Sequence, residues 1–240
     1  MADETLLRQT IGLADACELL QAAVPYPYEA LCEGLASGAL VEDARACLEE
    51  IGLGPAQTEE ACAGWEALRG RDPEELLAGL RRAYSLLHIR QGSGVAVWPY
   101  EAAFLHAAAG KPGEPALFRA PVTLAVEASM REAGVLPEDS RNEPCDSARD
   151  EFSFLSYLLG KEAEGLSADD GDAAALWRGR SDRFLAEHAL RWLPAFFAAV
   201  ARETQQAEEQ EAPSCAPLFY SSLCSFGKGV MGALALRLPS

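Results

Sequence analysis

"DPEELLAGLRRAYSLLHI", residues 72–89, carries the clearest helical pattern of the sequence. Asp72 is placed to cap a helix N-terminus, and Pro73 follows at the first helical position, where its missing N–H costs nothing. Apolar side chains then recur at three- and four-residue steps, as at Leu76, Leu80 and Leu87. The stretch therefore predicts an amphipathic helix with one buried face.

The same periodicity continues on both sides of this stretch. We expect further helices over residues 4–23, 27–38, 40–52, 58–70, 99–110, 117–134, 147–163, 170–190, 191–208 and 218–238. Alternating apolar and polar runs, which indicate strands, are scarce, and residues 95–98 form a short extended candidate without an obvious pairing partner. The sequence therefore predicts an all-α fold, with residues 1–240 in a single globular helical domain of roughly ten helices.

The polar, proline-containing segment "VLPEDSRNEPCD", residues 135–146, separates two helical halves. Such a connector is a candidate hinge, which we place near residues 136–146. Two protomers that exchanged halves about this hinge would form a dimer. We therefore expect a monomer or a domain-swapped dimer.

The net charge of −17 limits the classes of partner. It argues against nucleic acid and against anionic membrane surfaces, because both would be repelled, and it favours a basic partner. A role in solubility alone remains an alternative. The longest apolar stretch, residues 189–201, is too short to cross a bilayer, and residues 1–10 do not read as a secretory signal. We expect a soluble, cytoplasmic protein with no stable membrane insertion.

Catalytic and metal-binding motifs are missing from the sequence. It contains neither of the glycine-rich phosphate-binding motifs G-x-x-x-x-G-K-[ST] and G-x-G-x-x-G. It also contains no H-E-x-x-H and no G-x-S-x-G. The seven cysteines include no C-x-x-C pair, so neither a disulfide framework nor a zinc knuckle is indicated. The three histidines are scattered and are interpreted as packed or surface residues. We expect no enzymatic activity, metal or cofactor.

Residues 142–159, "NEPCDSARDEFSFLSYLL", bring four carboxylates close together. Ser147 and Asp150 have the spacing of a capping box, and Asp146, Asp150 and Glu151 lie where a helix dipole favours negative charge. Capping therefore explains three of the four acids and leaves Glu143 without a role. A metal site and a carboxylate acid/base pair remain open as alternatives.

Residues 143–155, "EPCDSARDEFSFL", resemble the signature E-P-x-D-H-x-x-x-E-L-x-F of the TorD/DmsD-like redox-enzyme maturation chaperones. The matching residues are Glu143, Pro144, Asp146, Glu151 and Phe154. Two positions depart from the signature, since Ser147 stands where the family usually has histidine and Phe152 where it usually has leucine. The missing histidine leaves open any detail of ligand recognition that depends on it.

Two further stretches carry the same resemblance. Residues 80–89 and 98–105 resemble the family's motif Y-x-x-L-F followed by P-Y-E-S. The matching residues are Tyr84, Leu87, Pro99, Tyr100 and Glu101. His88 stands where the family usually has phenylalanine, and Ala102 where it usually has serine. Residues 184–200 are similar to F-x-x-x-H-x-x-x-W-x-P-x-F through Phe184, His188, Trp192, Pro194 and Phe196. The aromatic side chains of residues 192–197 are interpreted as core.

The resemblance implies a cytoplasmic, all-helical chaperone. Such proteins bind the twin-arginine leader peptide of a molybdenum-containing oxidoreductase subunit and delay its export until the cofactor is inserted. The residues that we expect at the leader site are Tyr84, Leu87, Trp98, Pro99, Tyr100, Glu101, Glu143, Pro144, Asp146 and Ser147.

Two other function classes stay open beside the chaperone. One is a helical metal-dependent hydrolase that uses Glu143, Asp146 and Glu187. The other is a pterin or nucleotide binder in the same assembly pathway, with an anion held weakly at a helix N-terminus.

Overall fold

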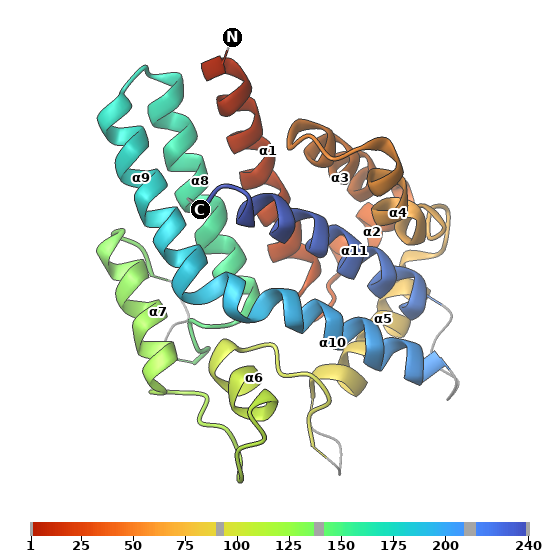
Figure 1. Cartoon of the computed structure of the whole chain (residues 1–240). Helices are drawn as coiled ribbons and strands as arrows, with labels where there is room; N and C mark the ends of the chain where they lie inside the picture. Colours follow the sequence, from red (N-terminus) through yellow and green to blue (C-terminus); the bar gives the residue numbers. More distant parts are fainter. Residues whose placement is uncertain (1, 90–93, 137–141, 209–214, 239–240) are drawn as a thin grey trace.

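The computed structural model describes residues 2–89, 94–136, 142–208 and 215–238 (Figure 1). These residues form helices throughout, and no strand occurs in them beyond one isolated bridge between Tyr100 and Ser147. The fold class is therefore all-α, as the sequence predicts. The helices are α1 (Ala2–Ala23), α2 (Glu29–Ser37), α3 (Ala39–Glu50), α4 (Pro55–Glu66), α5 (Pro73–His88), α6 (Glu101–Ala108), α7 (Pro121–Glu132), α8 (Ala148–Ser167), α9 (Gly171–Phe184), the π-helix η1 (Leu185–Ala189), α10 (Leu190–Glu208) and α11 (Ala216–Ala235).

Local sequence signals fix where the helices begin and end. The Asp72 carboxylate accepts hydrogen bonds from the backbone N–H groups of Glu74 (2.8 Å) and Glu75 (3.1 Å), and so caps α5 as predicted. Between α2 and α3 the chain turns at Gly38, whose φ of 88° is unfavourable for residues with a side chain. An added Cβ there would also meet the Arg69 guanidinium.

The helices pack around one continuous hydrophobic core. Helix α8 lies between α1 and α9 at one side of the molecule, and α10 and α11 lie side by side (Figure 1). Helix α11 also packs on α4, where the backbone and indole N–H groups of Trp65 donate to Ser222 Oγ and the Phe219 carbonyl, each at 3.1 Å. The predicted aromatic core of residues 192–197 is confirmed, because Trp192, Phe196 and Phe197 are buried.

The predicted helices over residues 170–190 and 191–208 join without a loop, through the π-helix η1. The chain changes direction there, so that α10 leaves at an angle to α9 (Figure 1). Inserted π turns often occur at functional sites. Here the turn carries His188, which is buried and faces the N-terminus of α6.

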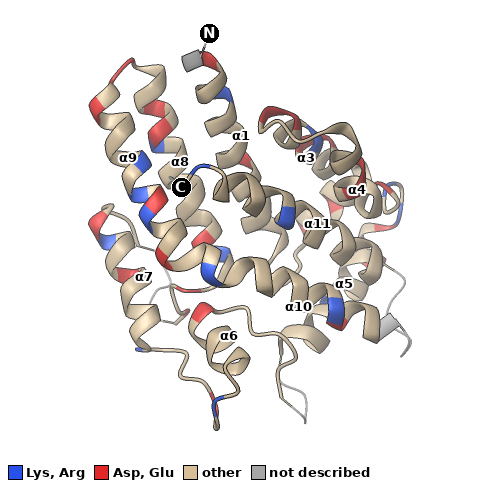
Figure 2. Cartoon of the chain, viewed as in Figure 1, with Lys and Arg blue, Asp and Glu red and all other residues tan. Residues whose placement is uncertain are grey.

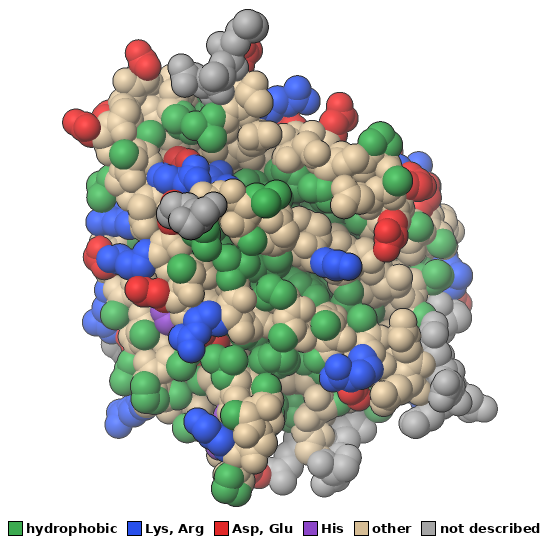
Figure 3. Space-filling view, in the orientation of Figure 1, with side chains coloured by type: hydrophobic (Ala, Val, Ile, Leu, Met, Phe, Trp, Pro, Cys, Tyr) green, Lys and Arg blue, Asp and Glu red, His purple; other side chains and the backbone are tan. Residues whose placement is uncertain are grey.

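Acidic residues occur on many of the described helices, interspersed with basic ones (Figure 2). The face drawn in Figure 3 likewise shows apolar side chains along α10 and α11 between separate charged groups. In the part of the chain that the structure describes, no helix is both long enough and apolar enough to cross a membrane.

The candidate hinge near residues 136–146 falls partly outside the described residues, which omit 137–141. On its C-terminal side, Pro144, Cys145 and Asp146 are buried and held against the segment before α6. Exchange of halves between protomers stays a prediction.

Candidate functional site

The first feature of the site is a contact between two segments that are far apart in sequence, residues 99–101 and 146–148. The Ala148 N–H donates to the Pro99 carbonyl (2.9 Å), and the Glu101 N–H donates to the Asp146 carbonyl (2.8 Å). These two bonds flank the antiparallel bridge between Tyr100 and Ser147. Two of the sequence stretches that resemble the chaperone family are thus joined directly.

Asp146 secures this contact by capping a helix other than its own. Helix α6 has no side-chain cap from Tyr100, its own N-cap residue. The Asp146 carboxylate instead accepts the Ala102 N–H at 2.9 Å, in the first turn of α6. Burial raises the pKa of Asp146, and the Ala102 N–H opposes that shift. The prediction that Asp146 favours the start of the helix after it therefore assigned the wrong helix.

Ser147 caps α8. Its hydroxyl oxygen accepts the Asp150 N–H at 3.0 Å, which is the first half of the predicted capping box. The side chain is buried, with 6% of its surface exposed. The serine at the position of the family's usual histidine therefore has a structural role in this chain.

Glu151 and Glu101 form a buried pair behind the two segments. Glu101 Oε2 lies 2.8 Å from His188 Nδ1, and Glu151 Oε2 accepts the Trp192 indole N–H at 2.9 Å. Both carboxyl groups have no exposed surface. Burial, followed by the neighbouring charge of Glu101, raises the pKa of Glu151 well above its usual range. The sequence predicted Glu151 as a negative charge at the start of the helix, and this was wrong because the side chain lies in the core, where burial favours the protonated form.

The remaining oxygen of each carboxyl group, Oε1 of Glu101 and Oε1 of Glu151, is buried. Neither atom has a hydrogen-bond partner among the described residues. A proton shared between Glu151 and Glu101 would supply the donor that both oxygens lack, and this hydrogen bond between the two side chains contributes to the raised pKa of Glu151. The pair then links α6, α8, η1 and α10 at one point.

Glu143, by contrast, remains partly exposed. Its carboxylate accepts the Tyr100 hydroxyl at 2.7 Å, which joins the connector to the segment before α6. Burial and the Glu143 charge together raise the pKa of Tyr84 to about 12, and burial is also the main cause of a raised pKa at Tyr100. Glu143 thus lies beside two phenols that stay protonated at neutral pH, with part of its own surface open to solvent.

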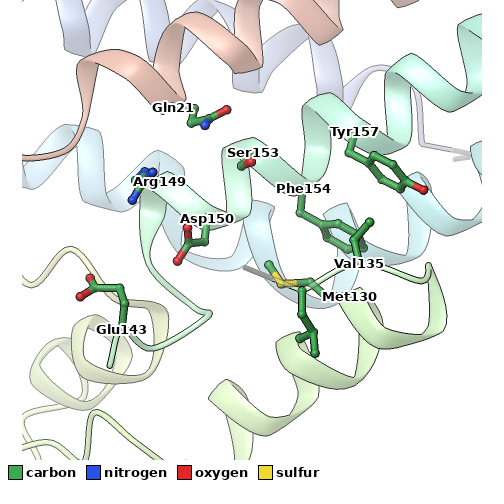
Figure 4. Close-up of a pocket in the computed structure, with 10 residues that line it drawn as sticks. Gln21, Met130, Val135, Glu143, Arg149, Asp150, Ser153, Phe154 and Tyr157 are labelled. Carbon is green, nitrogen blue, oxygen red and sulfur yellow. The ribbon is translucent and has the colours of Figure 1, made fainter. Parts of the chain in front are cut away.

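A cavity of about 510 Å³ opens beside Glu143 (Figure 4). Its lining residues come from the end of α1, from α7 and the residues after it, and from the first turns of α8: Gln21, Met130, Val135, Leu136, Glu143, Arg149, Asp150, Ser153, Phe154 and Tyr157. The cavity therefore combines charged groups with apolar and aromatic walls. We call it the α7–α8 groove.

The predicted site residues fall into two groups. Glu143, Tyr84, Trp98 and Tyr100 are partly exposed and are available to a ligand. The other six are buried and position the loops rather than offer a surface: Leu87, Pro99, Glu101, Pro144, Asp146 and Ser147. Among the ten, Glu143 is the residue that lines the groove.

Sequence reasoning missed most of the groove lining, including Met130 and Val135. One signal was available. Asp150, Phe154 and Tyr157 are spaced four and three residues apart, so they lie on one face of α8. This helix begins within a stretch that resembles the family signature. An acidic residue and two aromatic residues on one of its faces therefore indicated a candidate binding surface there.

The metal-dependent alternative receives no support from this arrangement. The described residues contain no group of three or more His, Cys, Asp or Glu side chains placed to hold a metal ion. Asp146 is committed to capping α6, while Glu187 is exposed on η1. Burial raises the pKa of Cys145 to about 11, so its thiol is protonated and a poor ligand at neutral pH.

Comparison with known proteins places the chain. No curated protein gives a significant match. The family model described as nitrate reductase delta subunit matches residues 54–198, which include the signature residues of all three stretches that resemble the chaperone family. Members of that family are chaperones of molybdoenzyme maturation. The chain belongs to the nitrate reductase delta subunit family, within the TorD/DmsD-like redox-enzyme maturation proteins.

Proposed function

We propose that this protein binds the twin-arginine leader of a molybdenum-containing oxidoreductase subunit in the α7–α8 groove, and that it delays export until the cofactor is inserted. The observation that carries the proposal is the composition of the groove, in which the partly exposed carboxylate of Glu143 adjoins apolar and aromatic walls. A twin-arginine leader has the complementary composition, a basic segment followed by an apolar one.

The affinity argument requires both parts of the groove. An exposed ion pair contributes roughly 0.2–1 kcal/mol, so two or three pairs fall short of the ~8 kcal/mol of micromolar binding. Burial of ~500 Å² of apolar leader surface would contribute ~12 kcal/mol before association costs of ~4–15 kcal/mol. Phe154, Tyr157, Met130 and Val135 at the groove contribute a portion of this apolar contact, and the leader would have to cover neighbouring surface as well.

The residues have different roles in this proposal. Glu143 receives a leader arginine, and Asp150, which is 7% exposed, adds a carboxyl group to the groove lining beside it. Tyr100 orients Glu143 through their 2.7 Å hydrogen bond, and Tyr84 adds an aromatic surface beside it. Asp146 acts indirectly, because it fixes the segment before α6 and so the position of Tyr100.

The same proposal covers the cellular setting. The protein works in the cytoplasm, before export, as a non-catalytic binding partner that needs no cofactor of its own. It exists as a monomer or as a domain-swapped dimer that exchanges halves at the connector.

Titration calorimetry with a synthetic leader peptide tests the proposal. Glu143→Gln should weaken binding, whereas Glu60→Gln, which removes an equal charge from an exposed position on α4, should not. Replacing both leader arginines by alanine should cost the wild-type protein more than the Glu143→Gln variant, which is the coupling that a double-mutant cycle measures. Salt near 1 M should reduce this coupling and leave the apolar contribution.

If the wild-type protein and the Glu143→Gln variant bind the leader equally, with no coupling to its arginines, Glu143 has no part in recognition. If no leader peptide binds the wild-type protein at all, the proposed function is wrong.

A further inference from the structure

The α7–α8 groove is polar at one end and apolar at the other. Glu143, Arg149 and Asp150 gather at the end nearest the start of α8, whereas Phe154, Tyr157, Met130 and Val135 gather at the opposite end (Figure 4). Ser153 lies between the two groups, and Gln21 lies over the polar end. The groove therefore has a direction, which a symmetrical apolar cleft would lack.

This direction follows the axis of α8. Asp150 lies in the first turn of the helix, and Tyr157 lies seven residues later on the same face. Seven helical residues span about 10 Å, the length of about three extended residues or two helical turns of a bound segment. A short bound peptide can therefore reach both ends at once.

We infer that the groove binds its ligand in one orientation, parallel to α8, with a basic N-terminal part at Glu143 and Asp150 and an apolar C-terminal part at Phe154 and Tyr157. The inference rests on the proposed function for the identity of the ligand, and on the charge distribution for its orientation. The reverse orientation would place arginines against Phe154 and Met130, which are 5% and 2% exposed, and would leave two carboxylates against an apolar segment.

Arg149 gives the polar end a second property. Its exposed guanidinium lies at the same end as Glu143 and Asp150, and its charge opposes the rise that burial causes in the pKa of Asp150. The groove thus already holds one cation where the ligand places its own. Arg149 is a specificity-determining residue, because it competes with a leader arginine for the acidic end and moderates affinity.

This competition predicts a gain of affinity from a loss of charge. Arg149→Gln should tighten the binding of a twin-arginine peptide by roughly two- to fivefold, the range that one screened ion pair supplies. Arg8→Gln is the matched control, since Arg8 is exposed on α1, thirteen residues before Gln21, and its removal makes the same change in net charge. The control should leave the affinity unchanged.

Photo-crosslinking tests the orientation on the full chain. The leader peptide carries benzoylphenylalanine either just before the arginine pair or at the end of the apolar segment, and mass spectrometry locates the crosslinks. The first probe should label residues around Glu143 and Arg149, and the second should label residues around Met130 and Tyr157. A peptide of reversed sequence, with the same composition, should bind more weakly.

The outcomes separate the two claims. Tight binding with the crosslinks exchanged, or equal affinity for the reversed peptide, overturns the orientation and leaves the proposed function standing. Weaker binding by Arg149→Gln overturns the competition. Absence of binding by either peptide overturns the proposed function and the inference with it.

Discussion

Replacing Glu151 by glutamine should change how the stability of the protein depends on pH. The Glu151 carboxyl group is fully buried, and its pKa is raised by burial and by the charge of Glu101. Glutamine has nearly the same shape. Its carbonyl oxygen can accept the Trp192 indole N–H in place of Glu151 Oε2, and its amide can donate to Glu101 as the shared proton does.

The magnitude follows from proton linkage. In the unfolded chain Glu151 titrates near 4.5, whereas in the folded protein it keeps its proton to a higher pH. Between these two values the folded state binds more protons, so the free energy of unfolding falls by about 1.4 kcal/mol per pH unit because of this group. The stabilising contribution is fully present below about pH 4.5 and is lost progressively above it. Glutamine does not titrate, so the variant lacks this loss.

The comparison between variant and wild type isolates Glu151 from other titrating groups. Burial also raises the pKa of Asp15, Asp146 and Asp150, and it lowers the pKa of His88 to about 4. These groups are present in both proteins, so the contributions of Asp15, Asp150 and His88 largely cancel in the difference of unfolding free energies, whereas the charge of Asp146 acts on Glu151 and forms part of the measured effect. That difference should shift in favour of the variant by up to about 1.4 kcal/mol for each pH unit from about 5 until the Glu151 carboxyl group ionises in the folded protein.

Urea unfolding followed by far-ultraviolet circular dichroism, at several pH values from 5 to 7, measures this difference. The control is Glu60→Gln, on the exposed surface of α4, for which the curves of variant and wild type should run parallel. Parallel curves for Glu151→Gln as well would refute the assignment of a protonated, buried carboxyl group at Glu151.

Three further outcomes are expected. Gly64→Ala should destabilise the protein by about 1–3 kcal/mol in a melting experiment, because the new Cβ would lie 2.0 Å from the Leu218 carbonyl oxygen; Gly160→Ala, which meets nothing within 4 Å, should have no such cost. Asp146→Ala should lose about 0.5–2 kcal/mol of stability through the lost cap of α6, and Asp146→Asn should lose less, as denaturant unfolding would show; equal losses would refute the capping role. Size exclusion should resolve slowly exchanging monomer and dimer, and monomer alone at every concentration and after partial refolding would end the swapping hypothesis.

The helices were predictable because their signals are local. Apolar residues repeat at helical spacing, and Asp72 and Ser147 cap the helices that follow them, as the structure confirms. The π-helix η1 was not predictable, since its residues continue the helical pattern of the helices on either side. Local pattern therefore gave the fold class and most element bounds.

The site was predictable in part. The family resemblance put Glu143 and Tyr100 among the residues expected at the leader site, and the structure joins their side chains by a hydrogen bond. The roles of Asp146 and Glu151 depend on partners in α6 and α10, more than forty residues away, so no local pattern reveals which acids are buried. The apolar wall of the groove comes from α7 and α8 together, and it exists only once the two are packed.

Amide hydrogen exchange of the whole protein, with and without a twin-arginine leader peptide, tests the central claim most directly because it locates the bound leader. The account predicts slower exchange at the two sides of the α7–α8 groove, in residues 142–157 and 130–136, with α3 and α4 unchanged. Binding of the leader with slower exchange confined to other helices, and none at the groove, would contradict the account.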